Sequence, residues 1–166
     1  MSHSNLFFTV GERILDDRGR LTGSVAAKLN LLIASVLDEM TVAEYWANTA
    51  DRALSTDTVW AAADPVTITF SATQNLDFGT FINGKITLTN NTVLQTPTNM
   101  KPGQSGCIEL IQDGTGSRTM DSTNTAYVWA GGTNGVLSTV AATRDAMFYR
   151  VLDDSKILLT LQKALA

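Results

Sequence analysis

The sequence predicts a mainly β protein with an N-terminal helical stem: an antiparallel β-sandwich or jelly-roll-like domain, preceded by an extended arm and one or two α-helices. The first observation behind this prediction is the period-two alternation of apolar and polar residues, as in residues 66–70 (VTITF) and 85–89 (KITLT). The second is the presence of turn signals that separate such segments at spacings of roughly 8–12 residues. The third is a helical apolar pattern over residues 24–54, which no glycine or proline interrupts.

The chain divides into three zones of different pattern. Residues 1–23 are expected to form an N-terminal docking arm, residues 24–58 the helical stem, and residues 59–166 the antiparallel β-sandwich domain. The arm contains short apolar runs and three glycines, and it is too short to fold alone. Its apolar residues are therefore expected to dock on another surface, although the LFF run at residues 6–8 is equally compatible with a strand of the β-domain.

An apolar seam runs along the stem. Its members recur at spacings of four, three and four residues, which is the pattern of a heptad seam. About two heptads are too short for a stable isolated coiled coil, so the seam either packs on its own domain or closes a bundle between chains held together elsewhere. In the second case we expect a homotrimer. The candidate interface residues are Val25, Leu29, Leu32, Val36 and Trp46.

A break in the stem is expected at residues 40–41. Thr41 and Glu44 have the spacing of a capping box, in which two side chains bind the free backbone N–H groups at a helix start. A second helix that carries Trp46 is therefore expected to begin there. From about Val59 onward the helical pattern gives way to the strand pattern.

Several turns of the β-domain are marked by their residues. Asn83 and Gly84 lie between apolar segments and predict a two-residue hairpin turn, because both tolerate a positive φ. Residues 107–120 predict a strand, a glycine-rich turn and a second strand. Residues 146–152 and 156–161 predict a terminal hairpin around a polar turn. No internal repeat of fixed period is present.

The sequence offers little for catalysis. His3 is the only histidine and Cys107 the only cysteine, which argues against a histidine-based triad, a histidine metal site and an internal disulfide. Cys107 is expected to pack as a small apolar side chain. Adjacent carboxylates, such as those at 153–154, do not converge as a glycosidase pair must, and residues 113–118 lack the spacing of a phosphate-binding loop. We expect no catalytic residue, metal or cofactor.

Composition narrows the possible partners. Of the 166 residues, 44% are apolar and only 17% are charged, and the net charge is −4. Nucleic acid is not an expected partner, because binding a phosphate backbone requires clustered lysine and arginine. No apolar run reaches the roughly 18 residues of a membrane-spanning helix. The N-terminus lacks the basic and apolar regions of a signal peptide, so we expect the chain to be made in a cytoplasm and not exported by that route.

A cluster of aromatic and polar residues forms the candidate ligand surface. Tyr127 and Trp129 precede the flexible GGTNG run at residues 131–135, which contains Asn134. Together these groups could stack on and bind a sugar ring. The alternative is that both aromatic residues lie on one strand face and pack in the core or in a subunit interface.

A resemblance spans roughly residues 46–152. It is carried by residues 46–60, 83–89, 97–103, 112–119, 129–133 and 137–139. Its most specific part is the pairing of QDGTGSRT (112–119) with WAGGT (129–133). These segments resemble virion structural proteins of tailed bacteriophages, namely the small β-domains of fibre, spike and capsid-decoration proteins. The resemblance implies a virion component that is made in a bacterial cytoplasm and has no enzymatic activity.

The expected function is therefore structural. We expect a trimeric capsid-surface decoration protein or a fibre or spike protein, anchored by its arm and stem to other virion proteins of the capsid or tail. The alternative is a carbohydrate- or receptor-binding tail-fibre module that attaches to a host-surface glycan. A glycan-degrading enzyme is disfavoured by the size of the chain and by the lack of a converging acid pair.

Overall fold

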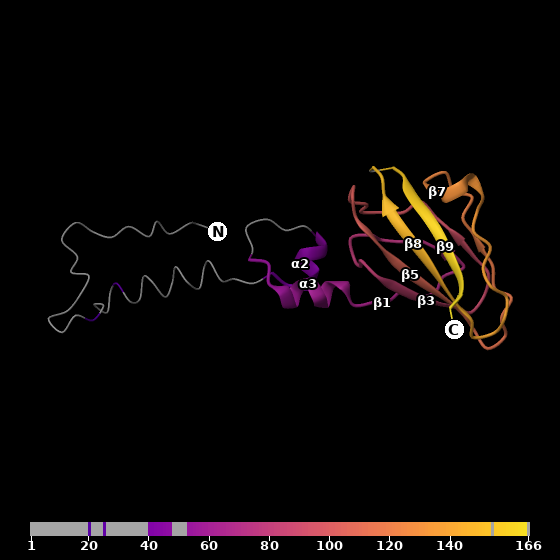
Figure 1. The fold of residues 1–166 in the computed structure, drawn as a ribbon, viewed down its shortest axis with the longest axis horizontal. Helices are drawn as coiled ribbons and strands as arrows, with labels where there is room; N and C mark the ends of the chain where they lie inside the picture. The colour runs from indigo at the N-terminus through magenta and orange to yellow at the C-terminus, as the bar shows by residue number, and fades with distance from the viewer. Residues whose placement is uncertain (1–19, 21–24, 26–39, 48–52, 154, 166) are drawn as a thin grey trace.

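The computed structural model describes residues 20, 25, 40–47, 53–153 and 155–165. Within these residues the protein is mainly β, with two short α-helices at one end of the β-region (Figure 1). The helices are α2 (Val42–Ala47) and α3 (Thr56–Ala63), followed later by the 3-10 helix η1 (Ala130–Gly132). The strands are β1 (Val66–Thr67), β2 (Thr73–Gln74), β3 (Gly84–Leu88), β4 (Thr92–Leu94), β5 (Ser105–Gln112), β6 (Met120–Asp121), β7 (Tyr127–Trp129), β8 (Arg144–Val151) and β9 (Ile157–Leu165).

The strands form a six-stranded and a three-stranded sheet. The order is β1-β3-β5-β8-β9-β7 in the larger sheet and β2-β4-β6 in the smaller one. Strands β1, β3 and β5 are parallel, as are all three strands of the smaller sheet and the pair β7 and β9. The expected antiparallel pairing is found only between β5 and β8 and between β8 and β9. The larger sheet is thus mixed, which corrects the prediction of an antiparallel sandwich.

Residues 66–121 wind back and forth between the two sheets with parallel strand pairing, and this segment is called the coil below. The chain alternates between the two sheets, so that the passes β1–β2, β3–β4 and β5–β6 lie side by side in register. Val66 pairs with Gly84, which in turn pairs with Ile108. Side chains alternate with a period of two in parallel and antiparallel strands alike, so the sequence pattern could not distinguish the two. The passes also differ in length, so the coil leaves no repeat of fixed period.

The hairpin predicted at Asn83 and Gly84 is wrong. Gly84 begins β3, and a Cβ at this position would lie 2.6 Å from Ile68 Cδ1. The Asn83 amide joins two neighbouring segments: its Nδ2 donates to Ala63 O at 2.7 Å, and its Oδ1 accepts from Cys107 N at 2.9 Å. The two residues therefore allow neighbouring passes of the coil to pack closely, and they do not reverse the chain.

The predicted terminal hairpin is confirmed. β8 and β9 pair antiparallel, with Tyr149 opposite Leu159 and Val151 opposite Ile157. The strand, glycine-rich turn and strand predicted over residues 107–120 are also found, but β5 and β6 belong to different sheets. The turn therefore carries the chain from one sheet to the other.

The helix start predicted at residues 40–41 is confirmed, while the preceding part of the stem, residues 26–39, lies outside the described residues. Thr41 N–H donates to Glu44 Oε2 at 2.9 Å, and Glu44 N–H donates to Thr41 Oγ1 at 3.2 Å, which is the capping box that starts α2. The strand pattern expected from Val59 is wrong over its first residues, because α3 continues to Ala63. Ser55 caps α3 by accepting a hydrogen bond from Thr58 N–H at 3.2 Å, and the alanines that follow favour the helix.

Apolar side chains from both sheets form one buried cluster. The larger sheet contributes Ile86, Ile108 and Met147, each at most 2% exposed, and the smaller sheet contributes Leu94 and Met120. The rings of Phe78, Phe81 and Tyr149 pack together with centroids 4.8–6.4 Å apart, and Phe78 lines the same cavity as Tyr45 and Trp46 of α2. This aromatic end of the core supports the cavity described below.

Candidate binding site

The aromatic pair proposed as a ligand surface is buried. Tyr127 and Trp129 lie on the inner face of β7 and are each 6% exposed. Tyr127 Oη donates to Gln95 O at 2.9 Å, and Trp129 Nε1 donates to Ser122 Oγ at 2.9 Å. This corrects the first interpretation in favour of packing in the core, since neither ring offers a face to a sugar. Asn134 remains exposed.

The glycine run after β7 serves the packing of Trp129. A Cβ on Gly135 would lie 2.5 Å from the Trp129 ring atom Cη2, so the backbone lies directly against the indole. The positive φ of Gly131 and Gly132 lets the chain turn there. The GGTNG run thus covers a core side chain.

The candidate interface residues fall into two groups. Leu29, Leu32 and Val36 lie outside the described residues, and so does His3. Val25 is helical and buried. Trp46 lies in α2, and its Nε1 donates to Ala62 O of α3 at 3.3 Å. The indole N–H of Trp46 is therefore used within the chain, where it joins the two helices.

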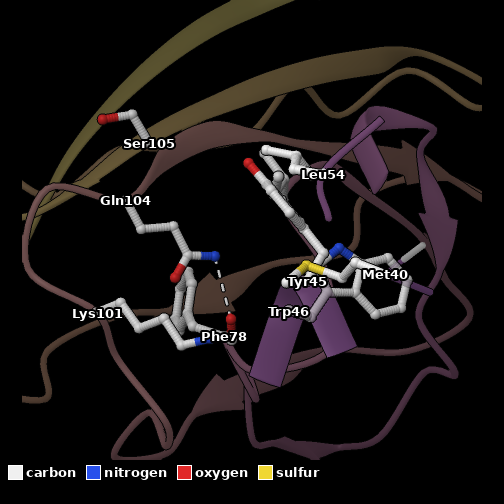
Figure 2. Close-up of a pocket in the computed structure, with 9 residues that line it drawn as sticks. Met40, Tyr45, Trp46, Leu54, Phe78, Lys101, Gln104 and Ser105 are labelled. Carbon is white, nitrogen blue, oxygen red and sulfur yellow. Dashed lines mark hydrogen bonds between the residues drawn. The ribbon is translucent and has the colours of Figure 1, made fainter. Parts of the chain in front are cut away.

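A cavity of about 450 Å³ lies between the α2 region and the coil. Figure 2 shows Met40, Tyr45, Trp46 and Leu54 on one side and Lys101, Gln104 and Ser105 on the other, with the Phe78 ring beside Gln104 and Lys101. Ile82 completes the lining. This volume is in the range of small-molecule sites in proteins, which combine an apolar lining with a few polar groups.

The helical wall of the cavity is fixed by hydrogen bonds between segments. Met40 N–H donates to Ala53 O at 2.8 Å, and Met40 O accepts from Thr58 Oγ1 at 2.8 Å. The Trp46 bond to α3 holds the other end of α2. These contacts place the aromatic residues of α2 opposite the coil.

Gln104 on the opposite wall holds a buried oxygen that has no hydrogen-bond partner among the described residues. Its Nε2 donates to Phe81 O at 2.9 Å and to Phe78 O at 3.0 Å, and it lies 3.3 Å from Tyr149 Oη. Because the two carbonyls require the NH₂ end of the amide, the orientation of the side chain is fixed. Its Oε1 is buried and accepts no hydrogen bond from the described residues. A buried acceptor without a donor costs about 1–3 kcal/mol.

Lys101 lies beside Gln104 and is partly desolvated. This desolvation lowers the pKa of the Lys101 amine, while the nearby Asp77 carboxylate raises it to a smaller extent. Asp77 Oδ1 already accepts from Gly79 N–H at 2.9 Å and from Asn99 Nδ2 at 2.8 Å. Lys101 also lines a smaller adjoining cavity of about 300 Å³.

Sequence reasoning missed this site. The lining comes from segments that are distant in sequence, and residues 101–105 carry no motif. The usable signal was Trp46, which the sequence pattern assigned to a subunit interface, while its neighbour Tyr45 was assigned no role. Gln104 is recognisable only from the structure, since its role depends on the carbonyls that surround it.

The cysteine and the possible metal ligands among the described residues do not form a second candidate site. Cys107 is half-buried on β5, where desolvation raises the pKa of its thiol and keeps it protonated. In the part of the chain that is described, no group of three or more histidine, cysteine, aspartate or glutamate residues is placed to hold a metal ion. No helix among the described residues is long and apolar enough to cross a membrane.

Comparison of the chain with protein-family models, with curated proteins and with solved structures gives no match.

Proposed function

We propose that the protein is a non-enzymatic structural component of a tailed-bacteriophage virion, either a capsid-surface decoration protein or a fibre or spike protein. It is made in the bacterial cytoplasm, assembles as a homotrimer, and is anchored by its N-terminal arm and stem to other capsid or tail proteins. The sequence resemblance over roughly residues 46–152 suggests the virion. The jelly-roll-like arrangement is not part of the proposal, because the parallel coil replaces it.

The observation that carries the proposal is the direction of the chain through the β-region. The helices lead directly into β1 at one edge of the larger sheet, and β8, β9 and β7 lie beyond β5 toward the other edge (Figure 1). Anchoring through the N-terminal region would therefore leave the terminal hairpin on the far side, facing outward. Such an arrangement, with the anchor at one end and the hairpin at the other, suits an appendage on a particle.

Exposed apolar side chains on the helical part support association. Trp60 of α3 is 74% exposed, and Leu54 just before α3 is 55% exposed. Tryptophan is enriched among the residues that dominate binding energy in protein interfaces. In the proposed trimer these side chains meet the neighbouring subunits beside the stem.

The experiment is a measurement of mass by light scattering together with cryo-electron microscopy of purified particles. We expect a trimer in solution, density for the β-region on the particle surface, and dissociation of the Trp60→Ser variant at micromolar concentration. Thr56→Ser on the same helix is the matched control and should remain trimeric. A monomeric wild-type protein, or particles without this chain, would contradict the proposal.

The second candidate is a carbohydrate- or receptor-binding module of a tail fibre that recognises a host-surface glycan. Because Tyr127 and Trp129 are buried, they cannot form the sugar-binding surface expected from the sequence. The cavity beside α2 is the remaining candidate site for such a ligand.

A further inference from the structure

α3 presents an exposed tryptophan between two acidic residues. Trp60 is 74% exposed, and Asp57 and Asp64, which lie three residues before it and four residues after it, are exposed as well. Residues at this spacing share one face of a helix. Because α3 contains no basic residue, this face combines a large aromatic side chain with two unopposed negative charges.

The exposed face of α3 points away from the cavity of its own chain. The buried residues of α3 face the α2 region, where Thr58 Oγ1 donates to Met40 O at 2.8 Å and Ala62 O accepts from Trp46 Nε1 at 3.3 Å. Trp60 lies two residues from Thr58 and from Ala62, which is about 200° around the helix. Its side chain can therefore reach such a cavity in another copy of the chain, but not in its own.

The cavity between α2 and the coil suits an aromatic side chain. Met40, Tyr45 and Phe78 give it an apolar and largely aromatic lining, and its volume of about 450 Å³ is in the range that accepts a drug-sized ring system. Leu54 belongs to the lining and is 55% exposed, so the cavity opens to the surface. Aromatic side chains that fill such pockets supply much of the binding energy of protein interfaces.

Lys101 adds a positive charge to this lining, across the cavity from Tyr45 and Trp46 (Figure 2). Its amine is partly desolvated, and the nearby Asp77 carboxylate compensates only part of this desolvation. A carboxylate next to the aromatic side chain of an occupant would meet the amine and complete the compensation. The exposed face of α3 supplies both groups, so the two surfaces are complementary in shape, polarity and charge.

We propose that the cavity receives Trp60 of a neighbouring copy of this chain, with Asp64 of that copy beside the Lys101 amine. The inference rests on the homotrimer of the proposed function and names one of its contacts. Because Trp60 and the cavity lie on different sides of the helical pair, the contact is heterologous, and three copies around a threefold axis close it into a ring. A tryptophan side chain buries about 150–250 Å², against the roughly 1,200–2,000 Å² of a stable interface, so this contact anchors a larger interface that includes the stem.

Photo-crosslinking from position 60 identifies what covers this side chain. Trp60 is replaced by the aromatic photo-crosslinker p-benzoylphenylalanine in the full-length chain. A denaturing gel after irradiation separates covalent dimers from contacts within one chain, and mass spectrometry identifies the joined peptides. We expect covalent dimers that join position 60 to the segments containing Met40 and Lys101. The same crosslinker at Val93, which is 42% exposed on β4, is the matched control and should not reach these segments.

A charge exchange tests the pairing of Asp64 with Lys101. Lys101→Glu and Asp64→Lys each place like charges at the contact, and each should weaken association by at least about tenfold, which is about 1.4 kcal/mol, in light scattering over a dilution series. The double variant exchanges the two charges and should recover most of the wild-type affinity. Asp121→Lys on β6 makes the same change of charge elsewhere on the surface and should associate as the wild type does. Circular dichroism melting of each variant verifies that the fold is retained.

Several outcomes would overturn the inference. In a trimeric protein, covalent dimers that join position 60 only to the stem or to position 60 itself would assign Trp60 to another contact and leave the trimer standing. Crosslinks only within one chain, or only to another protein of the particle, would exclude a neighbouring copy as the occupant. A double variant as weak as the single variants would exclude the pairing of Asp64 with Lys101. The expected crosslinks in a protein that is absent from purified particles would support this inference and contradict the virion function, so the two proposals can fail separately.

Discussion

The terminal hairpin and the parallel coil satisfy their backbone polar groups in different ways. In the hairpin, β8 and β9 are consecutive and pair with each other directly, and the reversal is closed by Leu152 N–H donating to Lys156 O at 2.9 Å. In the coil, each pass must leave one sheet for the other before it returns beside its neighbour. Some backbone groups at these corners bond to the backbone of the neighbouring pass, as Phe78 N–H does to Thr98 O at 3.0 Å, and others need side-chain partners.

Amide side chains fill this need in the coil. Gln112 at the end of β5 donates from Nε2 to Arg118 O at 2.9 Å and accepts from Arg118 N–H at 2.8 Å through Oε1. Gln74 accepts from Ser71 N–H at 2.9 Å, and Asn83 joins α3 to β5. These corners of the coil therefore depend on single side chains, whereas the hairpin depends mainly on a backbone ladder that tolerates substitution.

The largest effect is expected where the coil meets the hairpin. Gly106 of β5 pairs with Tyr149 of β8, and a Cβ there would lie 2.1 Å from Ile82 O and 2.9 Å from the Tyr149 ring. Because the first contact is with backbone, Gly106→Ala must push neighbouring passes of the coil apart, and the second contact must displace the Tyr149 ring of the hairpin. We expect a loss of about 3 kcal/mol or more in the free energy of unfolding by urea denaturation.

Gly114→Ala is the matched control for this change. Gly114 lies in the turn after β5, and no atom is within 4 Å of the position its Cβ would take. Its stability should stay within about 0.5 kcal/mol of the wild type, as is usual for surface substitutions. Equal stabilities of the two variants would show that the junction is not tightly packed.

The next largest effect tests a place where the hairpin also depends on a buried side chain. The ladder between β8 and β9 shifts register between Arg144 and Ala146. There the buried Asp145 accepts from Ser138 N–H and Oγ, both at 2.7 Å, and from Ala164 N–H at 2.8 Å. Asp145→Ala leaves these donors unpaired, and we expect it to cost about 2–3 kcal/mol of stability in urea denaturation.

Asp153→Ala in the exposed turn of the hairpin is the matched control. Among the described residues, Asp153 accepts local hydrogen bonds from its own turn, including those from the N–H and Oγ of Ser155. A loss below about 1 kcal/mol is expected for it. If Asp145→Ala were equally mild, the hairpin would be held by its backbone ladder alone.

The same contrast explains what the sequence could and could not predict. The terminal hairpin and the capping box at Thr41 and Glu44 are local, so neighbouring residues are enough to define them. The coil is non-local: Asn83 is a turn residue by its local sequence, and only its contacts with Ala63 and Cys107 show its role. The cavity was out of reach for the same reason, because its walls come from separate segments.

A smaller effect tests the amide corners directly. Gln112→Leu removes both hydrogen bonds to Arg118 while keeping an apolar side chain of similar size at a position that is 3% exposed. We expect a loss of about 1–2 kcal/mol in urea denaturation, because two backbone groups lose their partner. Gln162→Leu on the exposed part of β9 is the same change in the hairpin and should be nearly neutral. Equal losses in the two variants would contradict the distinction between ladder and corner.

The smallest effect concerns the acid stability of the turn that follows Gln112. Arg118 donates to Asp113 Oδ2 from Nη2 at 2.8 Å and from Nε at 3.1 Å, and the N–H groups of Gly116 and Thr115 donate to Oδ1. The hydrogen bond from Arg118, followed by the one from Gly116, lowers the pKa of Asp113 from 3.8 to about 2.

Because the folded pKa of Asp113 lies below the unfolded value, the carboxylate contributes stability above about pH 4, and this contribution is lost as the pH falls through about 2. The Asp113→Asn variant lacks this titrating group. Its melting temperature should therefore fall less between pH 5 and pH 2 than that of the wild type. Arg118→Met removes the main cause of the low pKa and should have a similar effect, and the double variant should add little to either single change. Asp113 is partly buried, and the pKa values of other carboxylates, such as Asp121 and Asp153, are also lowered, so the difference between melting curves should be small. Identical acid dependence of the wild type and Asp113→Asn would mean that this corner of the coil is held by the Gln112 amide without help from the ion pair.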